Sequence, residues 1–172
     1  MAKREIILLP DPVLKRVSAP VTTVDDEVRR LADDMLETMY AAPGLGLAAP
    51  QVGVSRRLFV VDLSDKDEEK KPFVMINPEI IHRSEKMNMH EEGCLSIPDV
   101  RVEIERPAEV VVRFLDRHGK PQEVKADDLF ATCIQHEIDH LDGRMLIDYM
   151  SSLKRDMTIR RFKKLARERQ GA

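Results

Sequence analysis

Two histidines and a glutamate in the C-terminal half of the chain are the residues best suited to chemistry. His136, Glu137 and His140 form an H-E-x-x-H pattern. Residues four apart share one face of a helix, so both imidazoles can bind one divalent metal ion. The glutamate between them can then accept a proton from a water molecule in the site. The pattern therefore predicts a hydrolytic metal site.

A catalytic metal ion of this kind needs a third protein ligand. Metalloproteases that extend the pattern supply a third histidine from the same segment, but here that position is Leu146. Other proteases take a glutamate from a following helix, whereas the corresponding region around residues 160–164 is basic. The third ligand must come from elsewhere, and the cysteines are the first candidates.

The chain has two cysteines, Cys94 and Cys133. Cys133 would lie about 7–8 Å along the helix from a metal between the histidines, whereas a Zn–S bond is about 2.3 Å long. We expect Cys133 to be a small packing residue. Cys94 belongs to a separate segment, between Gly93 and Pro98, which favours a shaped functional turn. The alternative for Cys94 is a buried thiol without a ligand role.

An uncharged segment of small residues, 44–53, carries a single polar side chain, Gln51. It lacks the lysine and the glycine spacing of a phosphate-binding loop. Small residues let a ligand or another backbone approach closely, and an amide side chain can both donate and accept hydrogen bonds. A tight connecting loop is the alternative interpretation.

Together, these three segments resemble the peptide deformylases. That family carries a G-x-G-x-A-A-x-Q motif, an E-G-C-L-S motif and a Q-H-E-x-D-H motif in this order. Here they span Gly44 to Gln51, Glu92 to Ser96 and Gln135 to His140. The resemblance extends over most of the chain. It implies removal of the N-formyl group from the initiator N-formylmethionine of new polypeptides, with release of formate.

The resemblance also implies roles for individual residues. Metal ligands would be Cys94, His136 and His140, holding Fe²⁺ in the cell and Zn²⁺ or Ni²⁺ in some preparations. Glu137 would be the general base, while the Gln51 side chain and the Leu95 backbone N–H would stabilise the developing oxyanion. The substrate would meet an apolar pocket and a backbone contact, formed by Leu45, Gly46, Leu95, Arg101, Leu129 and Cys133. Family pockets often have an aliphatic residue near position 90, where this chain has His90.

A helix from residue 126 to residue 141 must carry the histidines. Asp127 and Asp128 suit its first turn, and Gly143 suits the position just after its end. Apolar residues recur at helical spacing along it, at Phe130, Ile134, Ile138 and Leu141. A surface helix with solvated histidines is the less favoured alternative, because it assigns no function to His136, Glu137 and His140.

Other patterns predict the surrounding elements. A second amphipathic helix, near residues 25–41, places Val28, Leu31, Met35 and Met39 on one face, and we expect its methionines in the core. Alternating or apolar runs predict strands at 58–63, 73–76, 101–105, 110–115 and 123–125, with His118 in a turn. The expected fold is α+β, with short antiparallel sheets around the histidine helix and a C-terminal helix. One domain, residues 1–172, is expected.

Charge and composition, with only two cysteines and no export signal, predict an intracellular protein with one basic segment. The chain has a net charge of −3 and no apolar stretch long enough for a signal or a membrane span. We therefore expect a cytoplasmic protein without membrane or DNA partners. The predicted helix at about 153–169 lies in a segment of net charge +6. The resemblance implies that this helix contacts the ribosome, whereas a solvated helix is the simpler interpretation.

Two other functions compete with deformylation. A zinc endopeptidase would fit the H-E-x-x-H pattern alone, but the missing histidine at position 146 argues against it. A noncatalytic ribosome- or RNA-binding module would fit the basic segment. That interpretation leaves the set of Cys94, His136, Glu137 and His140 unexplained.

Overall fold

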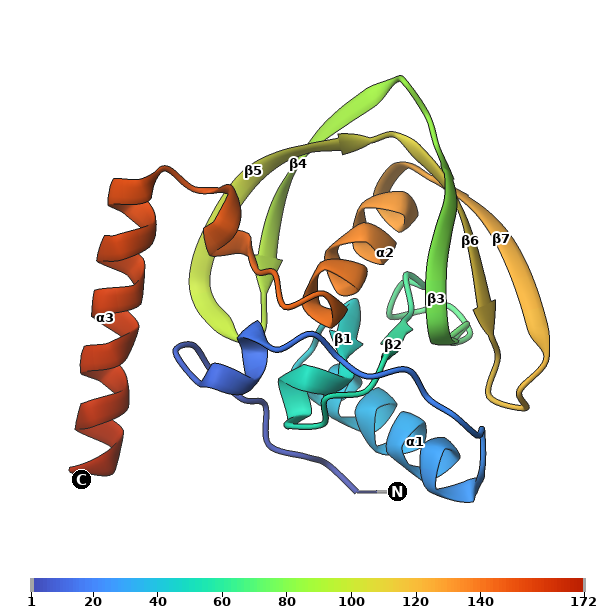
Figure 1. The fold of residues 1–172 in the computed structure, drawn as a ribbon, viewed down its shortest axis with the longest axis horizontal. Coiled ribbons are helices and arrows are strands. Elements are labelled where there is room, and N and C mark those ends of the chain that lie inside the picture. Colours follow the sequence, from blue (N-terminus) through green and yellow to red (C-terminus); the bar gives the residue numbers. More distant parts are fainter. Residues whose placement is uncertain (1, 172) are drawn as a thin grey trace.

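The computed structural model describes residues 2–171, so the two terminal residues of the predicted domain lie outside the description. The fold is α+β, as predicted. A five-stranded antiparallel sheet has the order β1-β2-β3-β6-β7, and a separate two-stranded sheet pairs β4 with β5. Helix α2 lies between the two sheets (Figure 1). The elements are η1 (Pro12–Lys15), α1 (Asp26–Ala41), β1 (Gly46–Ala48), η2 (Ala49–Val52), β2 (Leu58–Val61), β3 (Phe73–Arg83), β4 (Met87–Cys94), β5 (Ile97–Pro107), β6 (Glu109–Leu115), β7 (Pro121–Asp127), α2 (Asp128–Leu141), η3 (Leu146–Tyr149) and α3 (Ser152–Gln170).

Helix α2 begins two residues later than predicted and ends where predicted. Ala126 and Asp127 belong to β7, and Asp127 is the residue that precedes the helix. Gly143 has a φ of 77°, and a Cβ atom there would lie 2.5 Å from the Lys15 carbonyl oxygen. Glycine therefore ends the helix because no side chain fits in this left-handed conformation.

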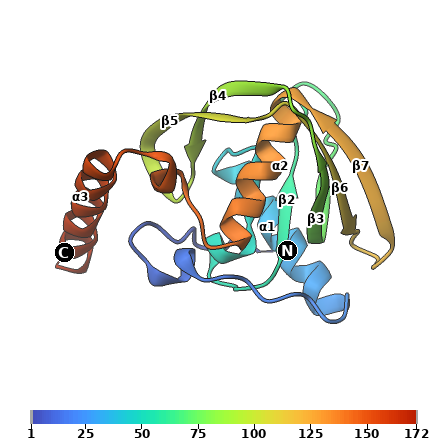
Figure 2. The same ribbon diagram turned by 45° about the horizontal axis from the view of Figure 1, so that its top comes forward.

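The large sheet is packed on both faces. All four residues of β2 are buried. Leu58 and Val60 pack in a cluster with α1, whereas Phe59 and Val61 pack in a cluster with α2. The predicted inner face of α1 is confirmed, because Met35 and its apolar neighbours are buried in the first of these clusters. The two helices thus cover opposite faces of the sheet, and this fixes α2 in the middle of the molecule (Figure 2).

The strands differ from prediction mainly in length. β3 and β5 each have 11 residues, so both run well beyond the predicted 73–76 and 101–105. β4 was not predicted at all, because half of its residues are polar and none is β-branched. Its pairing with β5, from Met87 opposite Pro107 to Cys94 opposite Ile97, supplies the hydrogen bonds that its composition does not suggest. The segment 44–53 contains β1 and η2 and is not merely a loop.

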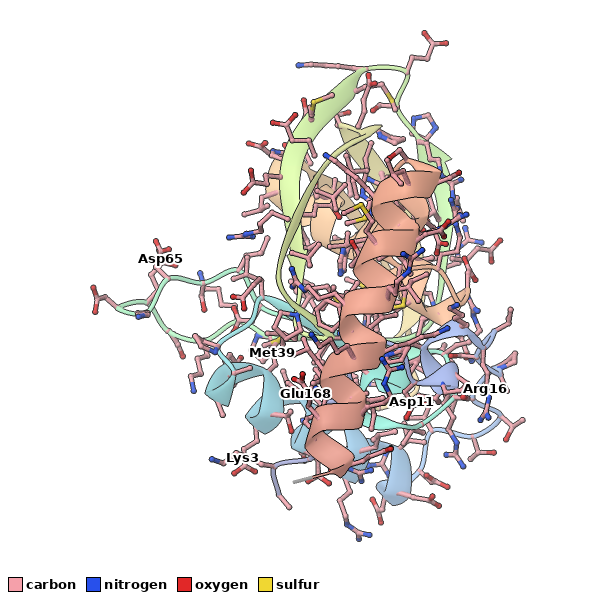
Figure 3. The ribbon with its side chains drawn as sticks, turned by 90° about the vertical axis from the view of Figure 1, so that its left-hand side faces the viewer. Lys3, Asp11, Arg16, Met39, Asp65 and Glu168 are labelled. Atoms are coloured by element: carbon pink, nitrogen blue, oxygen red, sulfur yellow. The ribbon has the colours of Figure 1, made fainter. Side chains whose placement is uncertain are left out.

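Helix α3 projects along one side of the molecule, as Figures 1 and 3 show. Ser151 precedes its first residue and caps it, because the Ser151 side chain accepts a hydrogen bond from the Lys154 backbone N–H. Phe162 is its one buried residue and packs with Leu9, Ile97 and η3. None of the helices among residues 2–171 has the length and apolar character needed to cross a membrane.

Candidate metal centre

The candidate site lies between strand β4 and helix α2, which face each other along their length. Alternate residues of β4 point to one face, and residues four apart on α2 do the same. Two residues of a strand advance by about 6.7 Å, and four residues of a helix advance by about 6 Å. Every second side chain of β4 therefore stays opposite every fourth side chain of α2. Three contacts join the two elements: His90 Nδ1 to Thr132 Oγ1 at 2.8 Å, Glu92 Oε1 to His136 Nδ1 at 3.0 Å, and Cys94 Sγ to His140 Nε2 at 3.3 Å.

The structure brings the three predicted metal ligands together. One ligand atom from each of Cys94, His136 and His140 lies within 4.8 Å of the other two. The two imidazole rings are 5.0 Å apart and meet edge to face. Cys133 is outside this set, as its position along the helix predicted, and burial raises the pKa of its thiol to about 12.

The two histidines have different electrostatic surroundings. Burial lowers the pKa of His140 well below its ordinary value, which favours the neutral imidazole that metals bind. Burial acts in the same direction on His136, but hydrogen bonds to Cys94 and Glu92 outweigh it and raise the pKa. Nδ1 of His140 is buried and has no hydrogen-bond partner among the described protein atoms.

Glu92 positions His136 and was not singled out from the sequence. Its carboxylate accepts two hydrogen bonds from Arg106, at 2.7 and 2.9 Å, besides facing the His136 ring. Arg106 also donates to Asp139 at 2.9 Å. Burial would raise the pKa of Glu92, but the contacts from His136 and Arg106 hold it below its ordinary value. A carboxylate bonded to the second nitrogen of a ligand histidine fixes its ring orientation and raises its basicity.

Glu137 lies beside the ligand set in a buried position. It is 3% exposed, and Oε1 makes no hydrogen bond within the described chain. Burial raises its pKa to about 7. A Cβ atom at Gly46 would lie 2.9 Å from Glu137 Oε2, so the small residues of β1 allow the carboxylate to reach this place. A carboxylate with a pKa near neutrality can both accept and return a proton.

Gln51 is held in one orientation at the edge of the ligand set. Its Oε1 accepts a hydrogen bond from the Ala48 backbone N–H at 3.0 Å. Its Nε2 donates to Ser96 Oγ at 3.1 Å and lies 3.5 Å from Cys94 Sγ. The amide therefore presents its donor side to the candidate site. The segment 44–53 serves to position this side chain and to make room for Glu137.

A cavity of about 840 Å³ opens onto the ligand set. Its lining includes Glu137, Gln51 and two of the ligands. All six residues expected at the substrate also line it: Leu45, Gly46, Leu95, Arg101, Leu129 and Cys133. A cavity of this size, apolar in part and bordered by a few fixed polar groups, is typical of a small-molecule or peptide site.

The donor set suits a catalytic divalent ion. One thiol and two imidazoles are the ligands that zinc and iron(II) accept, and three protein ligands leave a position for water or substrate. His136 already makes an outer contact of the kind that ligand histidines have. Glu137 Oε1 beside them is buried without a hydrogen-bond partner in the described part of the chain, so it is free to bond a water molecule or a substrate in the site.

Comparison with known proteins identifies the family. The family model for polypeptide deformylase matches residues 3–156. The peptide deformylase of Rhizobium meliloti (strain 1021) is 59% identical over 169 residues, which cover 98% of this chain and 97% of that protein. The peptide deformylase of Bartonella henselae is 54% identical over 98% of this chain and 96% of that protein.

A solved structure has the same fold. The crystal structure of peptide deformylase from Ehrlichia chaffeensis in complex with actinonin superposes with a TM-score of 0.90 at 42% identity, covering 95% of this chain and 98% of that one. The three motifs, the geometry of the site and these similarities agree. The chain belongs to the polypeptide deformylase family, whose members are hydrolases that use a catalytic metal ion.

Proposed function

We propose that this enzyme removes the N-formyl group from the initiator N-formylmethionine of newly made polypeptides and releases formate. The observation that carries this proposal is the buried Glu137 beside three metal-binding side chains at the wall of a substrate-sized cavity. Family membership supports the reaction, and the geometry supports the role proposed for each residue.

Cys94, His136 and His140 would hold one divalent ion, with Fe²⁺ as the expected metal in the cell. A Cys/His₂ set also accepts Zn²⁺ or Ni²⁺, so availability during growth and purification decides what is bound. When bound, the ion supplies Lewis-acid chemistry, which lowers the pKa of water to about 7 and polarises a carbonyl oxygen.

Glu137 would move the proton in this reaction. It takes a proton from the attacking water as the new bond forms to the formyl carbon. It returns that proton to the amine nitrogen as the carbon–nitrogen bond breaks, which leaves formate and a free amino terminus. The Gln51 amide and the Leu95 backbone N–H would donate to the oxyanion that develops on the formyl oxygen. One such donor is typically worth about 10²–10³ in rate.

The methionine side chain would enter the cavity between β1 and α2. Leu45, Leu129 and Cys133 supply apolar or weakly polar surface there, and Gly46 presents its backbone to the peptide. Arg101 lies further along the cavity wall, near Glu91, and would meet the following residues.

The basic helix α3 would bring the enzyme to the ribosome, in the cytoplasm, where its substrates emerge. Segment 153–172 has eight basic and two acidic residues, a net charge of +6, whereas the rest of the chain has −9. Apart from Arg155, which is half-buried, its basic side chains are exposed. A surface of this kind attracts the phosphates of RNA.

Formate release tests the activity. The enzyme should release formate from a formyl-Met peptide, fail to cleave the same peptide without the formyl group, and act poorly on formyl-Asp and formyl-Lys peptides. Equal rates on all three formylated peptides would contradict an apolar pocket. Cleavage of the unformylated peptide would instead indicate an endopeptidase.

Metal analysis tests the ligand assignment, and the second cysteine provides a matched control. Cys94→Ala should lose most of its bound metal because one of three protein ligands is gone. Cys133→Ala removes the same thiol from the same cavity but should keep the metal. Full metal occupancy in Cys94→Ala would overturn the assignment.

A further inference from the structure

His90 and Thr132 both line the substrate cavity. Thr132 lies about 6 Å along α2 from the ligand His136, on the side away from His140, so the contact is near the N-terminal end of the row of α2 residues that line the cavity. Thr132 lies about 12 Å from His140 and about 7.5 Å from Glu137 along the axis of α2. If the formyl group is placed at Glu137, a long unbranched side chain extends toward this pair.

The pair makes that end of the pocket polar. His90 Nδ1 and Thr132 Oγ1 are 2.8 Å apart, and His90 Nε2 lies 3.6 Å from a carboxylate oxygen of Asp128. Thr132 is 4% exposed, so its hydroxyl is largely removed from bulk water. The neighbouring sides of the cavity, from Leu129 and Cys133, offer no comparable donor.

The pair keeps one donor beyond its own contact. The hydroxyls of Thr38 and Thr158 donate to the carbonyl four residues earlier in their helices, whereas Thr132 contacts the His90 ring. When His90 Nδ1 carries the ring proton, it donates to Thr132 Oγ1, and the hydroxyl proton is free for a ligand. When Nε2 carries the ring proton, the hydroxyl donates to Nδ1; Nε2 then lies 3.6 Å from a carboxylate oxygen of Asp128, beyond hydrogen-bonding distance, so its proton is available to a ligand instead.

We propose that His90 and Thr132 form a polar end wall of the side-chain pocket, and that this wall admits N-formyl peptides whose first residue is methionine sulfoxide. The sulfoxide oxygen is a strong acceptor at the end of a side chain with the shape of methionine. An entirely apolar pocket would leave that oxygen without a partner and reject it. This inference rests on the proposed deformylation and concerns the substrates of the same site.

Three substrates distinguish the effect of the hydrogen bond on kcat/KM from the effect of side-chain size. Formyl-Met, formyl-methionine sulfoxide and formyl-norleucine peptides have first residues of similar length. Their terminal groups are a weak acceptor, a strong acceptor and a group without acceptors. The measured quantity is the ratio of kcat/KM for the sulfoxide peptide to kcat/KM for the norleucine peptide, followed by formate release.

Thr132→Val removes the hydroxyl and nearly keeps the shape, so it should lower this ratio about five- to tenfold, the factor expected for one neutral hydrogen bond. Thr132→Ser keeps the hydroxyl and should preserve the ratio. His90→Leu, which removes the partner from the other element, should lower it in the same direction. His82→Leu is the matched control, because His82 is an exposed strand histidine outside the cavity.

An unchanged ratio in both Thr132→Val and His90→Leu would overturn the polar wall. Should Thr132→Val fail to fold, His90→Leu decides by itself. Normal turnover of formyl-Met with an unmoved ratio would refute only this inference. Absence of formate release from every formylated peptide by the wild-type enzyme would refute the proposed function as well.

Discussion

Glu137 combines a buried position with a pKa of about 7, and the two properties have one cause. Burial penalises the charged carboxylate, and the nearby Glu92 adds to this effect. Its neighbour His136 opposes the shift but does not cancel it. A base with this pKa is half ionised near neutral pH, where it can exchange a proton in both directions.

Replacing this carboxylate should abolish turnover without removing the metal. Glu137→Gln keeps the size of the side chain but cannot accept the proton, so kcat/KM should fall by at least about 10²-fold. In the wild-type enzyme, kcat/KM should rise with pH and level off above about 7 as Glu137 ionises. Formate release across a pH series checks both statements. Glu103→Gln, on the exposed side of β5, is the control. Near-normal turnover of Glu137→Gln would refute the assigned role.

Glu92 should act on the metal through His136. Glu92→Gln keeps the shape of the side chain but weakens its contacts with His136 and Arg106. Loss of such an outer partner typically costs 10- to 100-fold in metal affinity. Chelator competition would measure this loss, and thermal unfolding of the metal-free protein would show whether the fold is also affected. If the metal-free protein is destabilised while the metal affinity stays at the wild-type value, Glu92 has a structural role alone.

At this scale, residue types and spacing predicted which side chains would meet, and packing decided how they are held. His136 and His140 follow from the helical period, whereas Cys94 was a candidate with a buried thiol as its alternative, and its ligand role was implied by the family resemblance. Glu92 stands only two residues before Cys94, yet its role depends on Arg106, which comes from the neighbouring strand. Nothing local in the sequence indicates that pairing, although the alternation of His90, Glu92 and Cys94 was a usable signal.

Among the elements, β4 and α2 form the site because two residues of a strand and four residues of a helix advance by similar distances. The strand is half polar and was not predicted, whereas α2 was predicted to within two residues. A strongly periodic apolar stripe identifies a helix from local sequence. A strand such as β4 is stabilised by its partner β5 and by contacts to α2, so its signal lies in distant residues.

Asp62, at the end of β2, connects the loop that follows it with α1. Its carboxylate accepts hydrogen bonds from the Tyr40 hydroxyl and from the backbone N–H groups of Ser64 and Lys71. Its own backbone N–H donates to Leu45, a residue of the cavity wall. Burial would raise the pKa of Asp62, but these hydrogen bonds lower it below the ordinary value of 3.8.

Asp62→Asn should destabilise the protein by about 1–3 kcal/mol near neutral pH, because buried donors lose a charged acceptor. The folded protein has the lower pKa, so this stabilisation is present above 3.8 and is lost as the pH falls through the folded value. The difference in free energy of unfolding should therefore shrink in acid. Urea unfolding near neutral pH and below 3.8 measures it. Asp65→Asn, at the outer end of the same loop (Figure 3), should have little effect at either pH. A difference that does not depend on pH would contradict this account of Asp62.

The molecule as a whole separates its charges. The basic helix α3 lies along one side of an acidic body (Figure 1), and Phe162 is its one buried residue. Truncation before α3 would remove Phe162 as well as the charges, so it would confuse loss of stability with loss of binding. Charge reversal on the exposed side of α3 separates the two effects.

Reversing Lys163, Lys164 and Arg167 to glutamate should weaken binding to ribosomes and reduce its dependence on salt, because fewer counterions are released. The melting temperature and hydrolysis of a short free peptide should stay near wild-type values, since all three side chains are exposed. Co-sedimentation with ribosomes across a salt series measures the effect. Reversal of Lys66, Arg83 and Lys86, three exposed basic residues of the body, changes the net charge equally and should weaken binding less. Equal losses in the two variants would show that net charge, and not α3, governs binding, whereas unchanged binding in both would exclude an electrostatic contact through this helix.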